Sequence, residues 1–181
     1  MFTTLQTTRR NLVLTGYVEP NKPRIGRQIA EQLKMPFVDV EAQIEARGGY
    51  SIEVLRTQFG ERRLRTVEAE VMEEIILHRN AVIRVNGSTL SHKQHYDNLQ
   101  QTSIIICLVA RLDAILQRMH LTLGARYHNP AERAVELGQL QREWAVRKHE
   151  GIHELDVTYR NEAGTIEDIL ALWGDLSIER G

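Results

Sequence analysis

Hydrophobic residues in this chain fall into short β-rich runs that alternate with helical patterns. The runs that predict strands are Asn11–Thr15, Phe37–Val40, Ala81–Val85, Ile104–Val109 and Val157–Arg160. Between them lie helical stretches long enough to cross over from one strand to the next, as parallel strands require. The pattern therefore predicts an α/β protein whose parallel sheet is covered by helices on both faces.

Two helical segments can be described more closely. The longest pattern runs from Ser51 to His78 and is interrupted at Phe59-Gly60, so we expect two helices, the first with Ser51 as its N-cap. A last helix is predicted over Thr165–Leu176, where apolar residues recur at helical spacing and should pack against the body. No internal repeat or flexible linker is evident, so residues 1–181 are expected to form a single domain.

Composition narrows the functional classes. The 181 residues are 42% hydrophobic and 26% charged, with a net charge of −1, as is usual for a globular domain. This charge, without basic and aromatic residues interleaved, argues against nucleic acid or an anionic membrane as a partner. No apolar run approaches a membrane span and no apolar signal core is present, so we expect a cytoplasmic location. The one cysteine, Cys107, lies in an apolar run and is expected to be a buried small hydrophobic residue.

The segment from Gly16 to Pro23 has the layout of a phosphate-binding loop between a strand and a helix. Gly16 and Lys22 fit the pattern G-x-x-x-x-G-K-[ST], whereas Asn21 replaces its second glycine and Pro23 its hydroxyl residue. Proline lacks both the N–H that would face a phosphate and the hydroxyl that would bind Mg²⁺, and Glu19 adds negative charge. We interpret the loop as one that keeps its shape while the nucleotide site is eroded.

A second segment, from Leu121 to Ala134, mixes small, polar and turn-forming residues before a new helix begins. Two interpretations stay open at this point. The segment is either a mobile lid that closes over bound phosphates or an ordinary connecting loop.

With these motifs in view, the chain resembles the shikimate kinase family from about Asn11 to Tyr159. The matching motifs are Ile25-Gly26-Arg27, Pro36-Phe37-Val38-Asp39-Val40-Glu41, Gly49-Tyr50-Ser51-Ile52, Gly60-Glu61 with Leu64-Arg65, and Arg147 with Asp156. The resemblance implies a three-layer P-loop kinase fold whose five-stranded parallel sheet has the order 2-3-1-4-5. It also implies phosphorylation of the 3-hydroxyl of shikimate, with ATP and Mg²⁺.

The resemblance further implies roles for single residues. On the nucleotide side it implies phosphate contacts from Gly16, Lys22 and the lid residue Arg126, and a water-mediated role of Asp39 at the metal. On the substrate side the implied residues are Glu41, Arg65, Gly87 and Arg147. Without the resemblance, Asp39 and Glu41 would be read as residues of a helix start, and the two arginines as surface residues.

The substrate side also departs from the family pattern. Glu41 stands where the family has an aspartate, and a run of three glycines is reduced to Asn86-Gly87-Ser88. These departures favour a shikimate-kinase-like protein with an eroded ATP and Mg²⁺ site that is non-catalytic or retuned to another small ligand, such as a hydroxy acid. Two alternatives stay open: an active ATP-dependent shikimate kinase, and a regulatory or structural protein partner of an active kinase.

Overall fold

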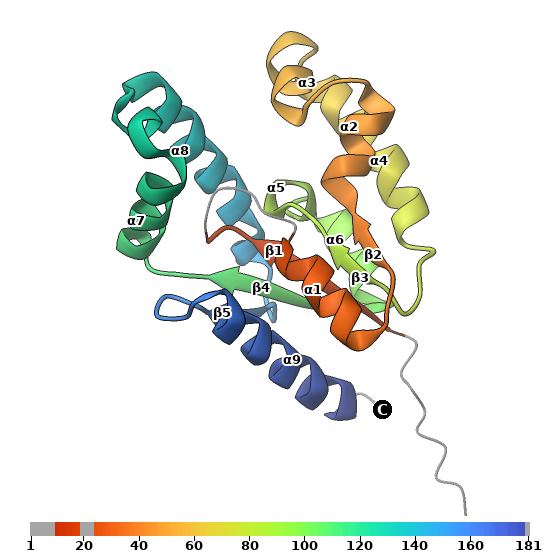
Figure 1. The fold of residues 1–181 in the computed structure, drawn as a ribbon. Helices are drawn as coiled ribbons and strands as arrows, with labels where there is room; N and C mark the ends of the chain where they lie inside the picture. Colours follow the sequence, from red (N-terminus) through yellow and green to blue (C-terminus); the bar gives the residue numbers. More distant parts are fainter. Residues whose placement is uncertain (1–9, 19–23, 180–181) are drawn as a thin grey trace, which may run out of the picture.

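A five-stranded parallel sheet forms the centre of the molecule in the computed structural model, which describes residues 10–18 and 24–179 (Figure 1). The strands are β1 (Asn11–Gly16), β2 (Phe37–Asp39), β3 (Val82–Arg84), β4 (Ser103–Val109) and β5 (His153–Asp156). Their order is β2-β3-β1-β4-β5, which confirms the predicted topology. The first strand is therefore central, and its carboxyl end lies between the ends of β3 and β4.

The fifth strand lies four residues before the predicted one, so the prediction of Val157–Arg160 was wrong. β5 is an edge strand in which half-buried and exposed side chains alternate, and its sequence His-Glu-Leu-Asp offers no apolar run. Val157, which carried the apolar signal, directly follows the strand and is buried, and its N–H donates to the carbonyl of Val109 at 2.9 Å. The hydrophobic pattern thus pointed to the residue that follows this strand rather than to the strand itself.

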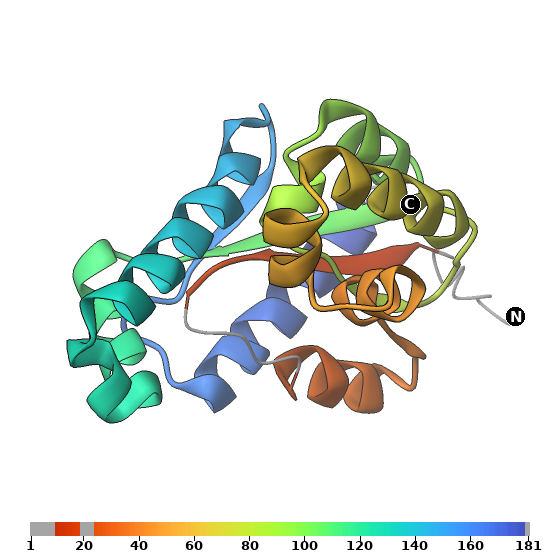
Figure 2. The ribbon, with the colours of Figure 1, turned by 90° about the horizontal axis from the view of Figure 1, so that it is seen from above.

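Helices cover both faces of the sheet (Figure 2). The α-helices are α1 (Arg24–Leu33), α2 (Val40–Gly48), α3 (Ile52–Gln58), α4 (Glu61–Ile75), α5 (Gly87–Leu90), α6 (Lys93–Gln100), α7 (Leu112–Leu123), α8 (Pro130–Trp144) and α9 (Glu162–Glu179). Leu12 and Leu14 of β1 pack in one cluster with residues of α1, α7 and α9, while Val13 packs in the other with residues of α2, α3, α4 and α6. The fold is the predicted three-layer arrangement. None of the described helices is long and apolar enough to cross a membrane.

The predicted break at Phe59-Gly60 and the predicted N-cap at Ser51 are both confirmed. The hydroxyl oxygen of Ser51 accepts the N–H of Val54 at 3.2 Å and caps α3, and Gly60, at φ +87°, separates α3 from α4. The last helix, α9, contains the predicted helix Thr165–Leu176 and extends beyond both its ends.

The segment 121–134 is helical in this structure rather than an irregular loop. It comprises the end of α7, a 3₁₀ turn over Gly124–His128 and the start of α8, which Asn129 caps by accepting the N–H groups of Ala131 and Glu132. Its action as a lid stays a prediction.

Candidate functional site

Gly16 closes β1 at the carboxyl edge of the sheet, and its backbone requires glycine. Its φ is +96°, and a β-carbon at this position would lie 2.3 Å from the carbonyl oxygen of Leu108. The strand therefore leaves the sheet in tight contact with β4, and Tyr17 and Val18 are buried directly afterwards. A phosphate contact of Gly16 stays a prediction, and Lys22 lies outside the described residues.

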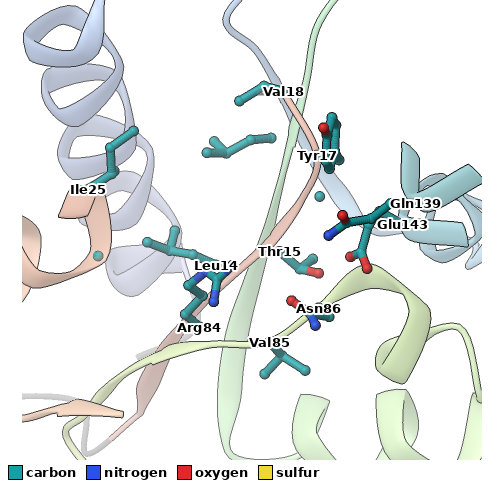
Figure 3. A pocket seen from close by; sticks show the side chains of 13 residues that line it. Leu14, Thr15, Tyr17, Val18, Ile25, Arg84, Val85, Asn86, Gln139 and Glu143 are labelled. Atoms are coloured by element: carbon teal, nitrogen blue, oxygen red, sulfur yellow. The ribbon is translucent and has the colours of Figure 1, made fainter. Parts of the chain in front are cut away.

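A cavity opens at this edge, between the ends of β1 and β3, the start of α1 and one side of α8 (Figure 3). It holds about 690 Å³ of empty space, part of it continuous with solvent. Leucine, valine and isoleucine side chains form much of its wall. Its polar side chains include Thr15, Arg84, Asn86, Gln139 and Glu143. An apolar cleft with a few convergent polar groups at the carboxyl ends of parallel strands is the usual form of a small-molecule site.

One guanidinium nitrogen bridges two of the predicted site residues. Nη1 of Arg84 lies 3.1 Å from Oδ1 of Asp39 and 3.2 Å from Oε2 of Glu41, and all three side chains are less than a fifth exposed. Asp39 also caps α2, because its Oδ1 accepts the N–H of Ala42 at 3.4 Å. Arg84 was not singled out from the sequence, although a charged residue inside an apolar strand run was a usable signal.

A second contact ties α8 to the start of α5, the short helix that follows β3. The carboxylate of Glu143 accepts hydrogen bonds from the N–H of Gly87 and, at 3.1 Å, from the hydroxyl of Ser88. Burial raises the pKa of the Glu143 carboxyl to about 7, against these hydrogen bonds, which favour the charged form. A β-carbon on Gly87 would lie 2.0 Å from the carbonyl oxygen of Glu143, so the helix backbone occupies the space that this glycine leaves.

A further cavity adjoins the first, and the two share Asn86, Gln139 and Glu143. Its other walls include Glu41 and Glu45 of α2, Arg56 of α3 and Arg142 of α8. This second cavity is the position that the sequence predicts for a phosphoryl acceptor, because Glu41 lies in it.

A sequence profile described as shikimate kinase matches residues 21–171. The chain belongs to the shikimate kinase family. It is 32% identical over 133 residues to the shikimate kinase of Thermodesulfovibrio yellowstonii, covering 72% of this chain and 77% of that one. It is 30% identical over 110 residues to the shikimate kinase of Caldicellulosiruptor bescii, covering 61% of this chain and 64% of that one.

The fold agrees with solved structures of the same family. The shikimate kinase from Acinetobacter baumannii in complex with shikimate superposes with a TM-score of 0.71 at 22% identity, covering 93% of this chain and 94% of that one. At this level of identity the likeness concerns the arrangement of helices and strands alone.

Three arginines for which the resemblance to shikimate kinases implies ligand contacts line neither of the two cavities. Arg65 is exposed on α4 and lines neither cavity. Arg147 pairs with Glu154 at 2.9 Å, and its guanidinium lies 5.5 Å from the centre of the Trp144 ring. Arg126 is exposed and pairs with Glu132 at 2.7 Å. The structure therefore brings Gly16, Asp39, Glu41 and Gly87 together near the carboxyl edge of the sheet. The ligand contacts of the three arginines stay predictions.

The described residues fit a Mg²⁺–nucleotide complex in part. Asp39 and Glu41 are carboxylates of the kind that bind Mg²⁺, but they share the guanidinium of Arg84. Within residues 10–18 and 24–179 no group of three or more histidine, cysteine, aspartate or glutamate side chains is arranged to hold a metal ion. Sites for Mg²⁺ with phosphates commonly use only one or two carboxylates, so Asp39 stays the candidate.

Proposed function

We propose that this protein is a small-molecule phosphotransferase of the shikimate kinase type, acting on a small hydroxylated acid at the carboxyl edge of its sheet. The observation that carries the proposal is the family match over residues 21–171, on a fold that brings Gly16 and Glu41 to adjoining cavities. ATP with Mg²⁺ would supply the phosphoryl group. Glu41 would accept a hydrogen bond from a ligand hydroxyl in the second cavity, where Ser88 and Gln139 supply further polar groups.

A second candidate is a protein that binds such a ligand without transferring phosphate to it. Two observations favour it. Asn21 and Pro23 replace the second glycine and the hydroxyl residue of the loop pattern, which removes a metal ligand. Arg84 also neutralises Asp39 and Glu41, the carboxylates that the metal and the acceptor would need. Each lost charge-assisted contact weakens binding by about 1.5–3 kcal/mol, so two losses would lower nucleotide affinity by roughly two to four decades.

Release of ADP from ATP, with and without shikimate and Mg²⁺, decides between the candidates. The first predicts ADP formation that depends on shikimate and Mg²⁺ and that is lost in Lys22→Met. Lys93→Met is the control, because Lys93 is an exposed residue of α6 that pairs with Asp97. No turnover, together with a rise in the midpoint of thermal unfolding on adding shikimate, would establish the second candidate instead.

A loop variant separates an eroded kinase from a repurposed one. Glu19→Gly, Asn21→Gly and Pro23→Ser together restore the P-loop pattern, while Gly16 and Lys22 are already present. If only the loop limits catalysis, this variant should gain both nucleotide binding and turnover. If Arg84 and the Asn86-Gly87-Ser88 segment also oppose catalysis, binding should return while turnover stays low.

A further inference from the structure

Thr15 carries a buried hydroxyl that no other described residue satisfies. The residue is 5% exposed, and its Oγ1 has no hydrogen-bond partner within residues 10–18 and 24–179. Buried hydroxyl groups are generally paired, because an unpaired one loses its hydrogen bonds to water on folding. Thr15 also lines the first cavity, so its side chain lies in the wall of a space that a ligand group could fill.

Three other polar side chains meet Thr15 at this point. Figure 3 shows Thr15, Asn86, Gln139 and Glu143 on the same side of β1, turned toward one another. They come from β1, from the N-cap position of α5 and from successive turns of α8. Asn86, Gln139 and Glu143 line the second cavity as well, so this group lies where the two cavities meet.

The chemistry of the group favours an uncharged polar ligand. A hydroxyl and two carboxamides can each donate and accept a hydrogen bond, and the carboxyl of Glu143 keeps free lone pairs after its bonds to Gly87 and Ser88. These four side chains include no cation, and the cavities' nearby arginines already pair with carboxylates, Arg84 with Asp39 and Glu41 and Arg142 with Glu53. A ligand carboxylate or phosphate held by the four would therefore meet the carboxyl of Glu143 and no cation among them. A ligand hydroxyl can instead donate to Glu143 and accept from an amide.

We propose that Thr15, Asn86, Gln139 and Glu143 form a subsite for the uncharged, hydroxyl-bearing part of a small ligand, such as the ring of a polyol. The subsite deepens the proposed function, on which it rests for its place beside the phosphoryl-transfer site. Binding there requires no nucleotide. Because burial raises the pKa of the Glu143 carboxyl to about 7, both its acid and its carboxylate are present near neutral pH, and each can bond a hydroxyl.

The test measures binding without ATP, so a protein that fails to turn over can still pass it. The probes are shikimate, its uncharged methyl ester and myo-inositol, titrated at millimolar concentration by calorimetry. The variants are Thr15→Val and Gln139→Ala. Thr102→Val is the matched control, because Thr102 is the other threonine whose buried hydroxyl lacks a partner among the described residues. It directly precedes β4, at the amino ends of the strands and away from the cavities.

We expect at least one uncharged probe to bind the unaltered protein. Thr15→Val and Gln139→Ala should each weaken that binding about three- to tenfold, as the loss of one neutral hydrogen bond implies, while Thr102→Val should leave it unchanged. Thr15→Val should unfold at or above the temperature of the unaltered protein, which shows that it folds. Equal affinity in Thr15→Val and Thr102→Val would mean that only water meets Thr15 and would overturn the proposal. Absence of binding by both uncharged probes would overturn it as well.

Discussion

The carbonyl oxygen of Glu143 lies 2.0 Å from the position that a β-carbon on Gly87 would take. The carboxylate of the same glutamate accepts the N–H of Gly87, so one residue of α8 meets this glycine through both its backbone and its side chain. The need for glycine at this position therefore arises from helix packing. Family resemblance had assigned Gly87 to the substrate, and that role stays a prediction.

Replacing Gly87 with alanine should destabilise the protein by about 1–3 kcal/mol, because backbone atoms of α8 must move to admit the methyl group. The midpoint of urea unfolding measures this change. Gly174→Ala in α9 is the control, since no atom lies within 4 Å of its added carbon. That variant should be stabilised by roughly 0.5–1 kcal/mol, as expected for alanine inside a helix. A Gly87→Ala protein as stable as the original would contradict the close packing described above.

Glu143 should make stability depend on pH. Its pKa is raised from 4.5 to about 7 in the folded protein, so the folded state holds the proton more tightly than the unfolded chain. The stability that this group contributes is complete below pH 4.5 and is lost as the pH rises to about 7. The total is roughly 3 kcal/mol for a shift of this size. Glu143→Gln should remove this part of the pH dependence, so its stability relative to the original protein should improve between pH 4.5 and 7.

Unfolding by urea at several pH values tests the role of Glu143. Glu132→Gln on the same helix is the control, because Glu132 forms an exposed pair with Arg126. A constant difference between Glu143→Gln and the original protein across this range would show that Glu143 does not titrate there.

Replacing Arg84 with methionine should leave Asp39 and Glu41 without their shared cation. We expect a loss of about 2 kcal/mol in the free energy of unfolding, since hydrogen bonds to charged groups contribute about 1.5–3 kcal/mol. Mg²⁺ should then raise the unfolding midpoint of the variant more than that of the original protein. Arg111→Met, which breaks the exposed pair with Asp113, is the control. If Mg²⁺ stabilised all three proteins equally, the two carboxylates would not form a metal site.

Cys107 should resist modification while the protein is folded. The residue is fully buried in β4, and burial raises the pKa of its thiol to about 12. At pH 8 the thiolate fraction is then on the order of a thousandfold below that of a free cysteine. Mass spectrometry after treatment with iodoacetamide should show no labelling in buffer and complete labelling in guanidinium chloride. Rapid labelling of the folded protein would show that β4 opens readily.

The sheet was largely predictable because most of its strands are buried and apolar. β1, β2, β3 and β4 follow runs of hydrophobic residues, and family resemblance supplied their order. β5 could not be found in this way because it lies at the edge of the sheet and buries few of its side chains. Its position is set by pairing with β4, and a contact between residues so far apart in the sequence leaves no local pattern.

The site was less predictable because its contacts join distant parts of the chain. Glu143 and Gly87 are separated by 56 positions, and Arg84 and Asp39 by 45. Only the packing of α8 and the pairing of β2 with β3 bring these residues together. Family motifs located Asp39 and Glu41, but they gave no sign of the arginine between them, because the resemblance assigned no role to that position.

The central position of β1 has a consequence for how the protein emerges from the ribosome. Asn11 of β1 pairs in register with Ser103 of β4. The apolar strand β1 therefore cannot pair with β4 until about 90 more residues have been synthesised. At about 5–20 residues per second, this takes roughly 5–20 s. During this time Leu12, Val13 and Leu14 are without β4, and we expect the nascent chain to be most prone to aggregate or to engage chaperones before β4 appears.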